Sequence, residues 1–248
     1  MVGTPWDANT YDRTSEPQQS WASEVLARLA GIAANATVLD VGCGTGRVTE
    51  ALLALVPEGR VLAIDASTDM VALARERLGG HAQVWCQSVL DLDLDEPVDA
   101  IVSTATLHWV SNHDLLFSRL ARALRPGGVL EIQCGGEGNI DRVRDAIQTA
   151  AHEHAPELLD WSPWIFAGPR ETERRLVQAG FGDVRCWLEE RPTYPDDVDA
   201  FVRTSILAAH FERLPEGRRE RFAAAVLAGV RLPLDYVRLN ASALRAPA

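Results

Sequence analysis

The chain contains no lysine, and all 24 of its basic residues are arginines. Two kinds of chemistry are therefore excluded. Schiff-base and lysine general-base catalysis both need a lysine amine. The phosphate-binding P-loop needs the lysine of its Gly-Lys-Ser/Thr motif.

A surplus of positive charge is also missing. The 248 residues carry a formal net charge of −11, which argues against nucleic-acid binding because that binding depends on basic patches. No apolar run is long enough to span a membrane. The first residues have neither the basic nor the apolar segment of a signal peptide. We therefore expect a cytoplasmic protein whose partner is a small molecule, with no nucleic acid and no membrane as partners.

The chain also lacks a pattern typical of metal ligands or disulfides. Its four cysteines are widely spaced and form no C-x-x-C pair, which favours buried, reduced thiols. His152 and His154 lie two positions apart in a predicted helix and therefore face apart. We expect no metal site.

A glycine-rich turn stands out near the start of the chain. The apolar residues 38–41 predict a buried strand, and Gly42, Gly44 and Gly46 follow at alternate positions. Glycine tolerates positive φ and has no Cβ, so such a turn brings backbone close to a ligand. Residues 47–55 predict a helix. This order of elements is typical of a nucleotide-type site at the carboxyl end of a parallel strand.

The spacing of the glycines distinguishes between ligands. The dinucleotide fingerprint requires G-x-G-x-x-G, whereas Arg47 occupies the place of its last glycine. The next predicted strand ends at Asp65, whose carboxylate can accept hydrogen bonds from both hydroxyls of a ribose. A ligand that contains a ribose but no phosphate group fits both features, and S-adenosylmethionine (SAM) is the leading candidate. An NAD-dependent oxidoreductase is a disfavoured rival.

Strand and helix patterns alternate along the chain. Up to Cys134, the predicted strands are residues 37–41, 61–65, 83–86, 98–103 and 128–134, and the predicted helices are residues 20–29, 47–55, 68–78 and 113–124. This alternation predicts right-handed βαβ units and a parallel sheet. Beyond Cys134, helices are predicted at residues 141–154, 170–179, 196–212 and 216–230, and strands at 184–189 and 235–242.

Four motifs carry a family resemblance. V-L-D-V-G-C-G-T-G, V-L-A-I-D, A-T-L-H-W and L-R-P-G-G resemble the successive motifs of class I SAM-dependent methyltransferases. Within that superfamily, the chain is similar to the small-molecule branch that includes trans-aconitate 2-methyltransferase. The resemblance implies an α/β fold with a doubly wound, mostly parallel, seven-stranded Rossmann-like sheet. Its last strand would pair antiparallel at the sheet edge.

The resemblance also implies a division of the chain. Residues 1–19 would form an arm over the active site, and residues 20–134 the SAM-binding core. Residues 135–248 would add the remaining strands and a helical lid, formed by insertions at about 135–168 and 193–232.

Most candidate site residues concern the cofactor SAM. Asp40 is expected to orient the glycine turn or the methionine amino group, and Asp65 to hold the ribose. Ser88 stands where the family often has an acidic residue that binds the adenine amino group. The complete set of expected cofactor contacts is Asp40, Gly42, Gly44, Gly46, Asp65, Ala66, Met70, Ser88, Val89, Thr104, Trp109 and Tyr11.

Fewer residues point to the substrate. His108 follows the fourth strand and is the candidate catalytic residue, as a substrate contact or a general base, with a purely structural role as the alternative. The expected substrate contacts are Trp6, Tyr11, His108, Trp164 and Tyr194. Arg170 and Arg203 are candidate carboxylate anchors because guanidinium groups bind carboxylates in a bidentate manner. Further aromatic residues of the lid, either pocket walls or lid core, are Trp161, Phe166, His210 and Phe211.

These observations predict a SAM-dependent methyltransferase for a small molecule. A carboxylate of the trans-aconitate type is the first choice, because a carboxylate is already ionised and needs no base. O- or C-methylation of a natural product or aromatic metabolite is the alternative, favoured by the aromatic lid. A non-catalytic SAM-binding protein is the alternative of another class.

Overall fold

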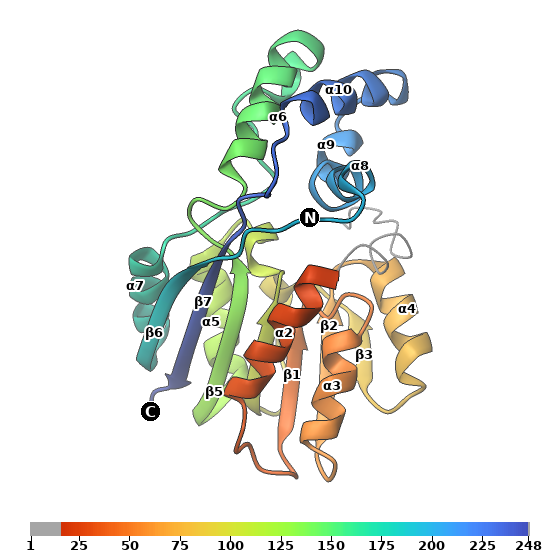
Figure 1. Ribbon diagram of the computed structural model, residues 1–248. Helices are drawn as coiled ribbons and strands as arrows, with labels where there is room; N and C mark the ends of the chain where they lie inside the picture. The colour runs from red at the N-terminus through yellow and green to blue at the C-terminus, as the bar shows by residue number, and fades with distance from the viewer. Residues whose placement is uncertain (1–15, 248) are drawn as a thin grey trace.

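A seven-stranded sheet forms the centre of the protein (Figure 1). The computed structural model describes residues 16–247, and the side chains from residue 21 onward. The strand order is β3-β2-β1-β4-β5-β7-β6. The strands are β1 (Thr37–Val41), β2 (Arg60–Asp65), β3 (Gln83–Cys86), β4 (Val98–Thr104), β5 (Leu124–Gly135), β6 (Phe181–Glu190) and β7 (Val237–Arg245).

The first five strands pair in parallel, as the alternation of strands and helices predicts. β7 pairs antiparallel with β5 and β6 and therefore lies one position inside the sheet. Our prediction that this strand forms the edge is wrong. Leu239, Ala241 and Ala243 of β7 are buried, whereas β6 alternates between partly buried and exposed residues, as an edge strand does.

Helices cover both faces of the sheet (Figure 1). One face packs against α2 (Glu16–Arg28), α3 (Arg47–Leu55) and α4 (Thr68–Leu78). The other packs against α5 (His113–Ala123) and α7 (Pro169–Ala179), with Phe117 and Leu176 in its core. This is the doubly wound α/β arrangement that the sequence predicts.

One connection differs from its prediction. The sequence predicts that the fifth strand begins at residue 128, but β5 already begins at Leu124, and Pro126 and Gly127 lie within it. The pairing of β4 with β5 jumps there from Val98↔Leu124 to Ala100↔Val129. The residues between form a bulge, which glycine with its wide range of φ accommodates.

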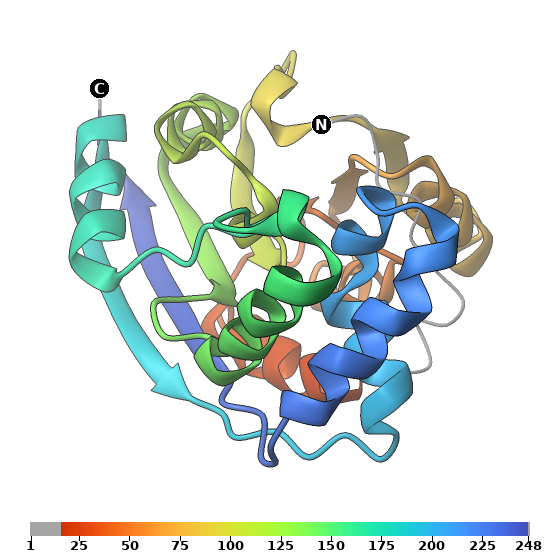
Figure 2. The ribbon, with the colours of Figure 1, turned by 90° about the horizontal axis from the view of Figure 1, so that it is seen from above.

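A second layer of helices lies above the carboxyl ends of the strands (Figures 1 and 2). It contains α6 (Asp141–His154), α8 (Val198–Phe201), α9 (Ala208–Glu212), α10 (Glu216–Gly229) and a π-helical turn, η4 (Val202–Ile206). These helices share a core of their own, which includes Phe201 and Phe222. Three short elements thus replace the continuous helical stretch predicted for residues 196–212. No helix in residues 16–247 is long and apolar enough to cross a membrane.

Candidate functional site

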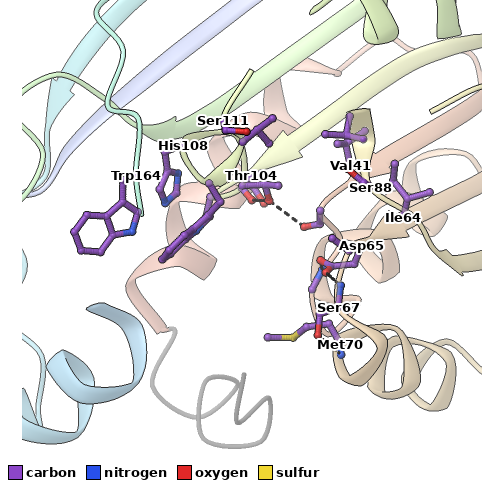
Figure 3. Close-up of a pocket in the computed structure, with 18 of the residues that line it drawn as sticks. Val41, Ile64, Asp65, Ser67, Met70, Ser88, Thr104, His108, Ser111 and Trp164 are labelled. Carbon is purple, nitrogen blue, oxygen red and sulfur yellow. Dashed lines mark hydrogen bonds between the residues drawn. The ribbon is translucent and has the colours of Figure 1, made fainter. Parts of the chain in front are cut away.

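A cavity lies between the sheet and the upper helices, at the carboxyl ends of the strands (Figure 3). The turn after β1, the end of β2, the two short helices η1 (Val89–Asp91) and η2 (Leu107–Trp109), and β7 all contribute to its wall. Ligands of doubly wound sheets bind at this edge. In Figure 3, Asp65 and Met70 lie on one side of the cavity, and His108 and Trp164 on the other.

The three glycines of the turn have different tasks. All have positive φ: +74° at Gly42, +54° at Gly44 and +84° at Gly46. A Cβ on Gly42 would lie 2.2 Å from the Thr106 side chain, and one on Gly46 would lie 3.2 Å from Ala74 of α4. A Cβ on Gly44 would meet no atom within 4 Å. Gly42 and Gly44 line the cavity, whereas Gly46 lies outside its wall and allows α3 and α4 to pack closely.

Asp65 joins the end of β2 to the glycine turn. Its Oδ2 accepts a hydrogen bond from the Gly44 amide at 2.9 Å, and its Oδ1 accepts one from the Ser67 amide at 2.8 Å. Burial raises the pKa of this carboxyl, and backbone hydrogen bonds from Ser67, Gly44 and Ala66 oppose that shift. The carboxyl group lines the cavity in a fixed orientation, and a carboxylate has about four lone-pair sites, so it can also accept from a ligand hydroxyl.

Asp40 lies beneath the turn and does not line the cavity. Its Oδ2 accepts a hydrogen bond from Thr49 Oγ1 at 2.7 Å. Burial raises the pKa of Asp40 from 3.8 to about 7. Of the two roles predicted for this residue, the structure favours support of the turn over direct contact with a ligand.

The wall near Asp65 contains the other residues expected around an adenosine. Ala66, Met70, Ser88 and Val89 all line the cavity. The Ser88 hydroxyl accepts a hydrogen bond from the Leu90 amide at 3.2 Å and so caps η1. It still has its own proton and another lone pair for a ligand.

His108 lies at the opposite end, and a backbone hydrogen bond fixes its tautomer. The Gly135 amide donates to His108 Nδ1 at 3.2 Å. Burial, followed by the positive charge of Arg238, holds the pKa of His108 well below 6.5. Since Nδ1 accepts a hydrogen bond from the backbone amide, the neutral ring carries its own proton on Nε2. His108 is therefore a hydrogen-bond donor to the cavity, and this geometry argues against a general base.

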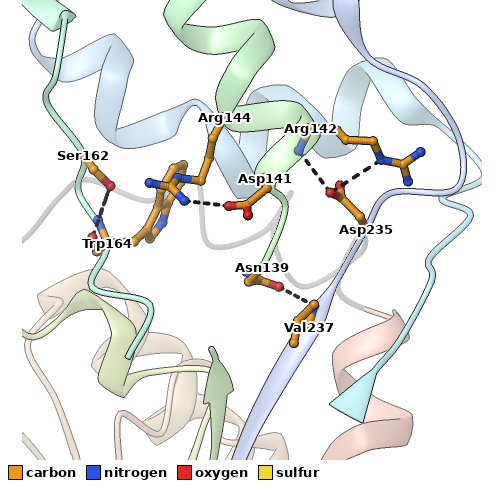
Figure 4. A network of polar contacts seen from close by, with 8 residues as sticks. All are labelled: Asn139, Asp141, Arg142, Arg144, Ser162, Trp164, Asp235 and Val237. Carbon is orange, nitrogen blue, oxygen red and sulfur yellow. Dashed lines mark hydrogen bonds and ion pairs between the residues drawn. The ribbon is translucent and has the colours of Figure 1, made fainter. Parts of the chain in front are cut away.

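Three more donors line this end, and sequence reasoning missed them. Arg238 of β7 is 2% exposed and supplies the positive charge. Asn139 holds the Val237 amide with its Oδ1 at 2.9 Å, which leaves its NH₂ group as the donor (Figure 4). Ser205 comes from the π-helical turn. Polar residues alternate with apolar ones along β7, and this pattern could have indicated that Arg238 lies on one face of the sheet.

Aromatic and apolar residues complete this end. Thr104, Trp109 and Trp164 line the cavity as expected, together with Phe166. The rings of Trp164 and Phe166 are stacked, with centroids 5.6 Å apart and planes 11° apart.

Other substrate candidates lie elsewhere. Tyr194 is 68% exposed and does not line the cavity, so the structure does not bring it together with the other predicted substrate contacts. Arg170 is exposed, and Arg203 pairs with Asp199 and Glu220. Trp6 and Tyr11 lie outside the described residues. Three lid aromatics that do not line the cavity belong to the core of the upper layer: Trp161, His210 and Phe211.

The two ends of the cavity differ in chemistry. Asp65 and Arg238 are the only aspartate and arginine among the described residues that line it. They lie on β2 and β7, which are four strand spacings apart, or roughly 19 Å. One end thus offers acceptors for hydroxyl groups, and the other a cation and neutral donors. Within residues 16–247, no group of three or more His, Cys, Asp or Glu side chains could hold a metal ion.

Comparison with known proteins gives consistent matches. A family model described as a methyltransferase domain matches residues 38–128. Trans-aconitate 2-methyltransferase of Methylobacterium nodulans is 41% identical over 183 residues, which cover 74% of this chain and 67% of that protein. The enzyme of the same name from Acidovorax ebreus is 31% identical over 239 residues, covering 87% of this chain and 91% of that protein.

Solved structures share the fold at low sequence identity. The YcgJ protein from Bacillus subtilis superposes with a TM-score of 0.65 at 14% identity, covering 92% of this chain and 100% of that one. A phosphoethanolamine N-methyltransferase of Haemonchus contortus, bound to S-adenosylhomocysteine, superposes with a TM-score of 0.61 at 16% identity, covering 96% and 59%.

Proposed function

This chain belongs to the trans-aconitate 2-methyltransferase family of class I SAM-dependent methyltransferases, and we propose that it methylates a carboxylate of a small organic acid. It is an enzyme that uses SAM and a small-molecule acceptor, which sets aside the non-catalytic and NAD-dependent alternatives. The proposal concerns the acceptor and the residues that hold each ligand.

The glycine end of the cavity fits SAM. The open space at Gly44 is where a Cβ would protrude, so the backbone can approach a ligand closely. Asp65 would hold the ribose hydroxyls with the free lone pairs of its carboxylate, while the Gly44 and Ser67 amides fix its orientation. Ala66 and Met70 would pack on the adenine, with Ser88 and Val89 at its polar edge.

One observation carries the choice of a carboxylate: the buried Arg238 lines the cavity at the same end as His108, whose tautomer makes it a donor. A buried arginine binds a carboxylate with charge-assisted, bidentate hydrogen bonds. Asn139 and Ser205 add donors at this end. A hydroxyl acceptor would need a group to take its proton, and His108 is in the wrong tautomer for that task.

The chemistry requires little else from the protein. SAM supplies an activated methyl group, and a carboxylate is already ionised at neutral pH. The remaining contribution is to hold the acid in position and to exclude water. Arg238 and His108 would orient the carboxylate, and Trp109, Trp164 and Phe166 would shield it from water.

The stacked pair of Trp164 and Phe166 supports a second candidate, an aromatic or natural-product acceptor. A flat ring could pack on this surface. This candidate predicts activity on acceptors that have no carboxylate, so the same assay separates the two.

The test is a methylation assay with labelled SAM. A panel would contain trans-aconitate, other small carboxylic acids, and phenols without a carboxylate. We expect a base-labile methyl ester from at least one acid. The variant Arg238→Met should raise the KM for that acid about 30-fold or more, because truncating one partner of a buried charged pair costs about 2–5 kcal/mol. SAM affinity should change little.

Arg170→Met is the matched control, since it removes an exposed arginine outside the cavity. It should leave both constants unchanged. Turnover of phenols but not of acids would overturn the proposal, as would an Arg238→Met variant with the wild-type KM for the acid.

The four cysteines are unpaired thiols. Such thiols are typical of a reducing compartment, which supports the predicted cytoplasmic location.

A further inference from the structure

Trp21 of α2 lies next to the end of the cavity that contains Arg238 and His108. The guanidinium carbon of Arg238 is 4.9 Å from the centre of the Trp21 ring. The same ring is 5.6 Å from the ring of Tyr236. Arg238 and Tyr236 line the cavity, whereas Trp21 does not. Trp21 can therefore influence a ligand through these two side chains.

The helix that carries Trp21 is anchored to the sheet at its other end. Arg28 donates to Glu131 Oε2 at 2.6 Å and to Asn240 Oδ1 at 3.2 Å. Ser242 donates to the other oxygen of Glu131 at 2.6 Å. Gln133 donates to Asn240 at 3.0 Å. Glu131 is 2% exposed, and its buried charge forms an ion pair with Arg28.

This anchor and Arg238 share one face of the sheet. Glu131 pairs with Ser242, Gln133 with Asn240, and Gly135 with Arg238. Side chains at alternate positions of a strand point to the same face, so these side chains form a polar ladder beneath α2. From Arg28 to Trp21 the helix rises roughly 10 Å, and from Ser242 to Arg238 the strand extends roughly 13 Å. The helix thus places Trp21 over Arg238 when Arg28 is bound to Glu131.

We propose that Trp21 is a positioning residue that holds the guanidinium of Arg238 for the substrate carboxylate. A cation stacked on a tryptophan face is attracted by the ring quadrupole. A ring against the flat face of the guanidinium keeps the N–H edges directed away from the ring. The ring thereby restricts the rotamers of Arg238, so that the acid meets a guanidinium that is already oriented. This inference rests on the proposed function, because it assumes that Arg238 binds the acid.

The experiment compares substitutions of two tryptophans. Trp21→Leu removes the ring and keeps an apolar side chain, and Trp21→Phe keeps a ring with a weaker quadrupole. Trp187→Leu is the matched control, because Trp187 also lies against an arginine, Arg28 at 5.2 Å, but outside the cavity. The probe is the acid of the panel above that wild-type protein methylates best. KM for the acid, kcat, and the dissociation constant of S-adenosylhomocysteine are measured for each variant.

We expect Trp21→Leu to raise the KM for the acid about tenfold and Trp21→Phe about threefold. The kcat and the affinity for S-adenosylhomocysteine should stay within about twofold of wild type, since Trp21 does not line the cavity in which the methyl group would be transferred. Trp187→Leu should leave all three constants near wild type. A purely structural role for Trp21 would lower thermal stability without this selective change in KM.

Each other outcome is decisive. If Arg238→Met raises the KM for the acid but Trp21→Leu and Trp21→Phe do not, the inference is wrong and the proposed function stands. If Trp187→Leu raises KM as much as Trp21→Leu, the effect belongs to the whole of α2, and the specific role of Trp21 is refuted. If Trp21→Leu does not fold, an unchanged KM in Trp21→Phe refutes the role. If no acid is methylated, both proposals fail.

Discussion

Gly44 offers a sharp test of the cofactor site, because its open side faces the cavity. A Cβ at this position would meet no protein atom within 4 Å, so a larger side chain would enter ligand space without striking the protein. The remaining cost is the backbone, since φ is +54°. A left-handed conformation costs an L-residue about 1–2 kcal/mol. We therefore expect Gly44→Val to fold, with about that loss of unfolding free energy, and to lose SAM binding.

The control for this variant is Gly79→Val. Gly79 has the same φ of +54°, and a Cβ there would approach nothing closer than 3.9 Å. Gly79 does not line the cavity. Urea unfolding should show similar losses of stability in the two variants, while calorimetry should detect SAM binding only in Gly79→Val. Comparable SAM affinities in the two variants would refute the cofactor role of Gly44. Complete unfolding of Gly44→Val alone would show that this glycine is structural.

Three further predictions concern ionisable groups. Asp65→Ala should weaken SAM binding by about 2–4 kcal/mol, because hydrogen bonds to a charged acceptor are lost; calorimetric affinity within twofold of wild type would contradict the ribose assignment. His108→Gln should lower kcat by less than tenfold, with a rate that is flat with pH above about 6; a rising limb that disappears in the variant would instead identify a base. The raised pKa of Asp40, about 7 against 3.8, means that the folded state holds its proton more tightly, so this contribution to stability is present below pH 4 and is lost as pH rises through 7. Between pH 4 and 8, Asp40→Asn should therefore gain up to roughly 4 kcal/mol of unfolding free energy relative to wild type, and a pH-independent difference in urea unfolding would be contrary to this expectation.

The elements close to the glycine turn were predictable because local rules determine them. The helices 47–55, 68–78 and 141–154 have the predicted bounds. Ser67 caps α4, and Gly79 ends it in a left-handed conformation, both of which are signals that a sequence shows directly. The loops that follow parallel strands share one edge of the sheet, so Gly44, Asp65 and Ser88 could be brought together from the sequence alone.

Other positions depended on contacts that sequence spacing does not encode. Tyr194 is aromatic and belongs to a segment expected above the site, yet it faces solvent. Arg203 has the right chemistry for an anchor, but Asp199 and Glu220 bind its guanidinium. A residue type shows what a side chain can do, whereas the tertiary structure decides whether that side chain reaches the cavity.

Arg238 shows how topology created a site that local patterns conceal. On the outer side of β6, the strand would not have paired with β5, and this arginine would lie away from Gly135. Because β7 inserts between β5 and β6, Arg238 instead pairs with Gly135, whose amide holds His108. The antiparallel direction of β7 also decides which of its residues reach the carboxyl ends of the parallel strands, since its first residues, and not its last, lie at that edge. The same insertion that overturned the predicted strand order thus brings the buried cation and the donor histidine to one end of the cavity.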